Sequence, residues 1–166
     1  MVEKILADQE YYEIVKNILE NHEFQKRKNF MHHENESVFE HVLEVSYYSY
    51  IYCKDHELDY EAAAIGGLLH DFYTKPWQNM EEKKPFFDQH GFVHATEALE
   101  NAWYYFPEYM NSKISNIIAR HMFPVNIIPP KYKEAWVVTM IDKRVSLKIF
   151  KNPRGLLKYV GIRKEI

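Results

Sequence analysis

The chain has 166 residues, of which 46% are hydrophobic and 16% aromatic, a composition typical of a globular protein rather than a disordered one. Its formal net charge of -3 at pH 7 argues against a nucleic acid polymer as partner, because binding one requires a basic surface. The single cysteine, Cys53, excludes an intrachain disulfide. We expect one domain over residues 1–166.

The N-terminal segment predicts an amphipathic helix over residues 3–20, because its apolar positions recur at helical spacing. With Glu3, Lys4 and Asp8 among its first residues, the segment lacks the apolar core of a signal peptide. The sequence has no run of about 18 apolar residues, so we expect no membrane span and no membrane partner. These observations favour a cytoplasmic protein.

The next part of the chain predicts two buried helices. Only five glycines occur in the sequence, and this scarcity favours helices with short connections over sheets. Ser37, followed three residues later by Glu40, is a capping-box signature, which predicts a helix that runs to about Lys54. Residues 58–69 are rich in alanine and apolar on several sides, which indicates a central helix.

A long loop and three more helices are expected after this pair. Residues 71–89 contain Pro76 and Pro85 and few periodic apolar positions, and loops of this length are often functional. Residues 136–138 could form a strand by periodicity alone, but their flanks favour a buried helix. We interpret the basic tail at 152–166 as a solvated surface segment. The expected fold class is all-α, a compact bundle of about six or seven helices, the last three at residues 91–106, 112–121 and 131–149.

The sequence contains nine histidines, and histidine is the commonest metal ligand in proteins. A possible companion ligand is Asp142, which shares a helix face with Val138 and Val145. That face is apolar, and aspartate is almost never buried unless it is paired or binds a metal. An ion pair, for example with Arg120, is the alternative interpretation of this aspartate.

Other histidines stand at the ends of apolar helices. His121 follows Ile117 on the buried stripe of its helix, and His70 closes another helix and is followed by Asp71. A lone histidine at such a place is more often a core residue than a ligand, but six residues from five helices are hard to explain separately. Mixed nitrogen and oxygen ligands suit iron, manganese or zinc better than calcium. The set comprises His41, His70, Asp71, His94, His121 and Asp142.

The order of these six residues resembles the HD superfamily of metal-dependent phosphohydrolases. The local contexts are similar too, with Ser-Val-Phe-Glu-His at residues 37–41 and Leu-Leu-His-Asp at residues 68–71. The resemblance covers about residues 33–146, which leaves the N-terminal helix and the basic tail as extensions. It is nearest to small bacterial hydrolases that carry His-Met-x-Pro, here residues 121–124, and Asp-Lys, here residues 142–143.

This resemblance implies a divalent-metal cofactor and the residues that bind it. In the simplest members, one ion is held by the residues that match His41, His70, Asp71 and Asp142. Members with two further histidines usually hold a second ion, and His94 and His121 match those positions. Asp71 would then bridge two ions, and His70 and Asp71 would form the catalytic pair. Iron or manganese is expected, with zinc, nickel or cobalt as alternatives.

Four further residues are candidates for the substrate pocket. Lys143, next to the last ligand, and Lys75, four residues after the His-Asp pair, could neutralise phosphate charge. Many members carry a lysine three residues after the pair, so Lys75 departs from that spacing. His33 and His90 lie near the site in the sequence, and either could line the pocket or donate a proton.

The resemblance implies hydrolysis of a phosphomonoester or phosphoanhydride by a metal-activated hydroxide. The expected partner is a small phosphorylated substrate, a nucleotide or another metabolite. Three alternatives stay open: a dinucleoside polyphosphate hydrolase, an HD-fold di-iron oxygenase and a non-catalytic HD binding module. The tyrosine-rich helix faces could also support a homodimer.

Overall fold

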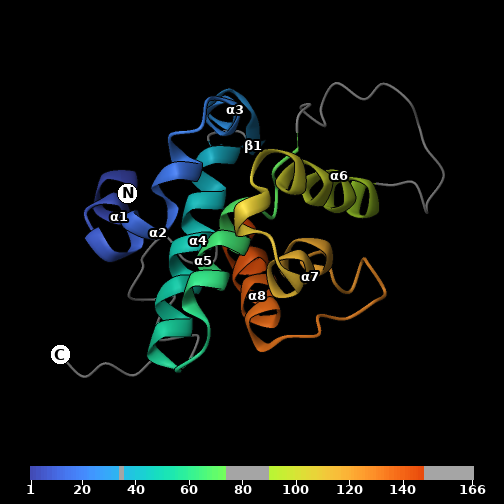
Figure 1. The fold of residues 1–166 in the computed structure, drawn as a ribbon. Coiled ribbons are helices and arrows are strands. Elements are labelled where there is room, and N and C mark those ends of the chain that lie inside the picture. The colour runs from blue at the N-terminus through green and yellow to red at the C-terminus, as the bar shows by residue number, and fades with distance from the viewer. Residues whose placement is uncertain (34–35, 74–89, 148–166) are drawn as a thin grey trace.

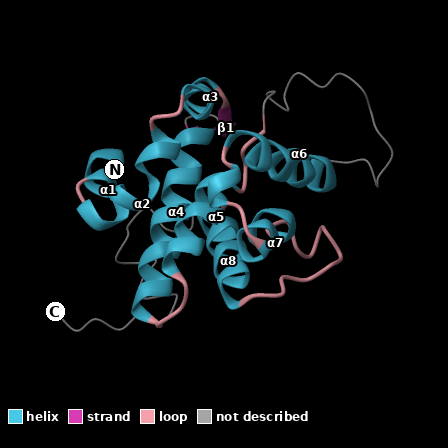
Figure 2. Ribbon diagram, viewed as in Figure 1, coloured by secondary structure: helices cyan, strands magenta, loops and turns pink. Residues whose placement is uncertain are grey.

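The computed structural model describes residues 1–33, 36–73 and 90–147. Helices dominate this part of the chain, beside one small two-stranded ribbon (Figure 2), so the predicted all-α fold class is confirmed. None of the helices within these ranges is long and apolar enough to cross a membrane. The long helices are α4 (Val38–Asp55), α5 (Tyr60–Leu69), α6 (His90–Tyr105), α7 (Ser112–Arg120) and α8 (Lys133–Ser146).

The N-terminal region differs from the single helix expected over residues 3–20. It forms two helices, α1 (Val2–Leu6) and α2 (Gln9–Leu19). The break falls at Asp8, whose side chain accepts a hydrogen bond from the Tyr11 backbone N–H at 3.1 Å and so caps a new helix. Five short elements were not expected: α3 (His22–Gln25), the 3₁₀ helices η1 (Lys26–Asn29) and η4 (Pro107–Tyr109), and the two strands of an antiparallel ribbon, β1 (Met31–His33) and β2 (Glu36–Ser37).

The starts of the long helices follow the local sequence. The capping box is present at the start of α4: Ser37 Oγ accepts from the Glu40 N–H at 3.2 Å, and the Glu40 carboxylate accepts from the Ser37 N–H at 3.0 Å. Asp59 and Asn111 cap α5 and α7 with their own side chains. Residues 136–138 lie within α8, as the helical interpretation predicted. The expected long loop lies mostly, and the basic tail entirely, outside the described residues.

The long helices pack around α4 and α5, which lie side by side at the centre (Figure 1). Helix α8 packs against both of them, α7 contacts α5 and α8, and α6 contacts α7. Helices α1 and α2 cover α4 and α5 from another side. This arrangement brings the C-terminal ends of α5 and α7 to the place where α4, α6 and α8 meet. The core that they share includes Leu43, Leu68, Ile117, Val138 and Ile141, all buried.

Two glycines near the end of α5 let this helix approach its neighbours closely. A Cβ atom on Gly67 would lie 2.9 Å from the Ser46 Cα of α4, and one on Gly66 would lie 2.7 Å from a methyl carbon of Ile117 in α7. Neither position has room for a side chain without movement of the neighbour. The last turn of α5 is therefore held directly against α4 and α7.

Candidate metal centre

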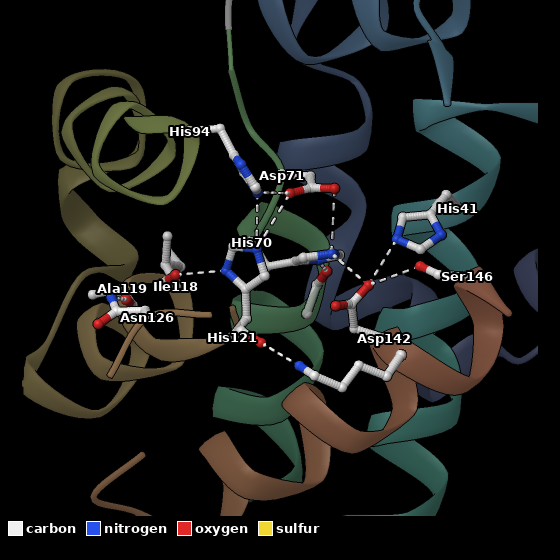
Figure 3. Close-up of polar contacts among 12 residues, drawn as sticks. His41, His70, Asp71, His94, Ile118, Ala119, His121, Asn126, Asp142 and Ser146 are labelled. Carbon is white, nitrogen blue, oxygen red and sulfur yellow. Dashed lines mark hydrogen bonds and ion pairs between the residues drawn. The ribbon is translucent and has the colours of Figure 1, made fainter. Parts of the chain in front are cut away.

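The six residues singled out from the sequence come together in one place, and Figure 3 shows their side chains pointing toward one another. His70 and His121 are the C-cap residues of α5 and α7, and Asp71 follows His70, so helix ends supply three of the six. All are buried except His94, whose side chain is 23% exposed, so solvent reaches the cluster there. The other three lie within helices: His41 in α4, His94 in α6 and Asp142 in α8.

One group of donor atoms lies between α4, the end of α5 and α8. Asp142 Oδ1 lies 3.1 Å from His41 Nε2 and 3.6 Å from His70 Nε2. His70 Nε2 also lies 3.6 Å from Asp71 Oδ2. Ligand atoms of His41, His70 and Asp71 all lie within 4.8 Å of one another, close enough to surround one ion.

A second group lies on the other side of Asp71, toward α6 and α7. Asp71 Oδ1 lies 3.2 Å from His94 Nε2 and 3.5 Å from His121 Nε2. The two histidine nitrogens are 3.2 Å apart. Asp71 therefore presents one carboxylate oxygen to each group, and it is the residue that the groups share.

The donor set fits divalent transition-metal ions. Ligand atoms that are each about 2.1 Å from one ion lie roughly 3–3.5 Å apart, which is close to the 3.1–3.6 Å separations given above for the two groups. His70 Nε2 and Asp71 Oδ1 are buried and make no hydrogen bond, so both have unused bonding capacity facing the centre. Four imidazole nitrogens and two carboxylates are ligands that iron, manganese and zinc accept and that calcium does not favour.

Two of the histidines are oriented by the helices that end in them. The Nδ1 atom of His70 lies 2.7 Å from the Gly67 carbonyl oxygen, and that of His121 lies 2.8 Å from the Ile118 carbonyl oxygen. A carbonyl only accepts, so Nδ1 carries the proton in both bonds. In the neutral imidazole, Nε2 is then the atom with a free lone pair, and it faces the cluster.

Burial alone would raise the pKa of both carboxyl groups of the cluster. The surrounding histidines outweigh burial and hold the pKa of Asp71 and of Asp142 well below the usual range. For His70, burial acts to lower the pKa, but the two neighbouring carboxylates outweigh it and raise the pKa to about 9. The pKa of His121 is lowered, with burial as the main cause. The centre is therefore built around two ionised carboxylates in a buried setting.

The predicted pocket residues lie in different situations. Lys143 is partly buried, and its Nζ donates to the His121 carbonyl oxygen at 3.0 Å, so contact with a phosphate would require the amine to leave this bond. Burial lowers the pKa of Lys143, while Asp142 acts in the opposite direction. Lys75 lies outside the described residues. His33 belongs to β1 and His90 begins α6, but their side chains also fall outside the described part.

Several supporting contacts were not expected from the sequence. Ser146 Oγ donates to Asp142 Oδ1 at 3.4 Å, one helical turn along α8. The Asn101 side chain donates to the Phe72 carbonyl oxygen at 2.9 Å and so ties the segment after Asp71 to α6. The contact of Ser146 could have been predicted from its spacing, because it lies four residues after Asp142 on the same helix. Nothing local in the sequence indicates the contact of Asn101.

The comparisons with known proteins agree with this geometry. The family model of the HD domain matches residues 38–146, the larger part of the chain. The chain belongs to the HD domain family. This is an all-α family of metal-dependent phosphohydrolases, and all six residues of the cluster lie within the matched HD domain. Comparisons with curated proteins and with solved structures found no match.

Proposed function

We propose that this HD domain hydrolyses a phosphomonoester or phosphoanhydride of a nucleotide or another small phosphorylated metabolite. The observation that carries the proposal is the position of Asp71, whose two oxygens face two separate groups of possible ligands. Such a shared carboxylate suits a pair of ions that act together on one phosphoryl group. Membership of the HD family supports the same class of chemistry.

The two groups would hold two divalent ions, iron or manganese by the character of their ligands. When bound, such ions supply a Lewis acid that activates water and neutralises charge on a phosphoryl group. We assign Asp71 as the bridging ligand and, with His70, as part of the catalytic centre. The first ion would be held by His41, His70, Asp71 and Asp142, and the second by Asp71, His94 and His121.

The chain's own residues prepare the site for a charged substrate. Asp71 and Asp142 stay ionised because neighbouring histidines lower their pKa, so the cluster can receive cations without first losing carboxyl protons. His70 and His121 are held by backbone carbonyl groups, so their rings need not reorient on binding. His94 stands at the exposed side, where a phosphate group would enter.

A panel of phosphorylated metabolites tests this proposal. Purified protein with Mn²⁺ or Fe²⁺ is expected to release phosphate from at least one nucleotide or sugar phosphate, and Asp71→Ala should abolish the release. Asp55→Ala, which changes an exposed aspartate of α4, is the matched control and should keep activity. Activity that survives Asp71→Ala would place the chemistry elsewhere. Including a dinucleoside polyphosphate and an oxygen electrode in the panel separates the alternative reactions.

A further inference from the structure

Arg27 in η1 lies outside the matched HD segment and is completely buried, with 0% of its surface exposed. Its Nη1 donates to the Glu23 carbonyl oxygen at 2.7 Å. Its Nη2 lies 3.7 Å from the Glu23 carboxylate, too far for a hydrogen bond, and neither Nη2 nor Nε makes one. A buried guanidinium with unused donors destabilises a fold, so its presence calls for a compensating role.

Besides its ion pair with Glu23, the guanidinium group lies against two aromatic rings. Its central carbon is 4.5 Å from the centroid of the Phe72 ring and 5.1 Å from that of Phe30. Both distances are within the range of favourable cation–π contacts. Phe30, at the end of η1, also stacks on Tyr73, with ring centroids 6.3 Å apart and planes 7° apart. The η1 segment therefore contacts both residues that follow Asp71.

These two residues connect η1 to the metal centre. The Tyr73 N–H donates to the Asp71 carbonyl oxygen at 3.0 Å, which closes a tight turn immediately after the ligand. The edge of the Tyr73 ring also meets the ring of His94, with centroids 6.2 Å apart. The turn that carries Asp71 is thus held by η1 on one side and by α6 on the other.

We propose that Arg27 is a positioning residue for Asp71, acting through the Phe72 ring on which its guanidinium lies. Asp71 must direct one oxygen to each group of ligands, and a small rotation of its turn would move both oxygens. An immobile Phe72 prevents that rotation. The inference rests on the proposed metal centre, and it adds the N-terminal region to the parts of the chain that determine metal affinity.

The test measures Mn²⁺ affinity and, separately, the urea midpoint of the metal-free protein. Arg27→Met keeps the volume but removes the cation. It is expected to weaken Mn²⁺ binding by about tenfold or more, the usual effect of losing a residue that orients a ligand. The urea midpoint should stay unchanged or rise, because a poorly satisfied buried charge is removed. Lys26→Met, at an exposed position of the same element, is the matched control and should change neither quantity.

A second variant keeps the inference testable if Arg27→Met does not fold. Arg27→Lys retains a cation near Phe72 but loses the planar group, so an intermediate loss of Mn²⁺ affinity is expected. Wild-type affinity in either folded variant would overturn the inference. A lowered urea midpoint that accompanies the loss of affinity, or failure of both variants to fold, would also overturn it by making Arg27 a purely structural residue. Absence of Mn²⁺ binding by the wild type would instead reject the proposed metal centre.

Discussion

At the scale of single residues, the centre depends on which nitrogen each histidine presents. Helix ends leave their last carbonyl groups without partners, and His70 and His121 use such a carbonyl, three residues earlier, to fix the proton on Nδ1. That these two histidines belong to the candidate centre could be predicted from the sequence, because an apolar helix ending in histidine is recognisable. The tautomer of each histidine could not be predicted, because it is set by the hydrogen bond between the ring Nδ1 and a backbone carbonyl oxygen.

Lys143 gives a prediction at this scale. Its amine donates to the His121 carbonyl oxygen and so joins α8 to the end of α7. Lys143→Met should lower the free energy of unfolding by about 1 kcal/mol, the usual contribution of one such bond, as measured in urea. Lys143→Arg should lower the free energy of unfolding less than Lys143→Met does. A raised KM for the phosphorylated substrate with an unchanged free energy of unfolding would instead favour a direct contact with phosphate.

Arg27 marks a limit of prediction from sequence. It stands between Lys26 and Lys28, and such a run of charges is typical of a solvated surface. The structure buries only the middle residue of the run, because η1 turns that side chain toward Phe72. Phe30 is only three residues away, but the nearer ring, Phe72, comes from a distant part of the chain, so local sequence gives no sign of the burial.

At the scale of elements, local signals predicted the starts of the helices better than their continuity. The capping box of Ser37 and Glu40 placed the start of α4 correctly. The periodic apolar positions of the N-terminal segment concealed the cap at Asp8, where the helix ends and a new one begins. The β1–β2 ribbon is held by pairing between two very short segments, which a search for alternating strands does not detect.

The close packing of α5 gives a prediction for Gly67. Gly67→Ala would place a Cβ 2.9 Å from the backbone of Ser46, which cannot move as a flexible side chain could. Overpacking of this kind costs roughly 1–3 kcal/mol, and the better helix propensity of alanine offsets about 1 kcal/mol. A net loss of stability is therefore expected in urea unfolding, together with weaker Mn²⁺ binding, because the Gly67 carbonyl oxygen orients His70. Unchanged stability would show that α4 and α5 can separate easily.

At the scale of the whole molecule, a charged cluster joins the starts of three helices whose opposite ends carry or lead into residues of the candidate metal centre. Lys113 lies at the start of α7. Its Nζ is 2.9 Å from the carboxylate of Asp59, the residue before α5, and 3.1 Å from the carboxylate of Glu134, at the start of α8. Burial acts to raise the pKa of both acids, but hydrogen bonds from Lys113 and from backbone N–H groups lower both values. The same contacts raise the pKa of Lys113 against the effect of burial.

These pKa shifts predict how stability depends on pH. Acids with a lowered pKa stabilise the fold above their ordinary pKa and lose this contribution as pH falls through the lowered value. Lys113→Met should therefore reduce the free energy of unfolding at pH 7 by roughly 1–3 kcal/mol, because Glu134 loses a partner. The difference in free energy of unfolding between this variant and the wild type should shrink when urea unfolding is measured below about pH 4, where the acids become protonated. Lys16→Met, in an exposed pair, is the control and should have little effect.

The central claim is that Asp71 bridges two metal ions, and a titration of metal-free protein with Mn²⁺ tests it most directly. The wild-type chain is expected to bind about two ions, since each group offers ligands for one. Asp71→Ala, folded by circular dichroism, should lose tight binding at both positions, whereas Asp55→Ala should bind as the wild type does. No binding by the wild type, or two ions retained by Asp71→Ala, would contradict the account.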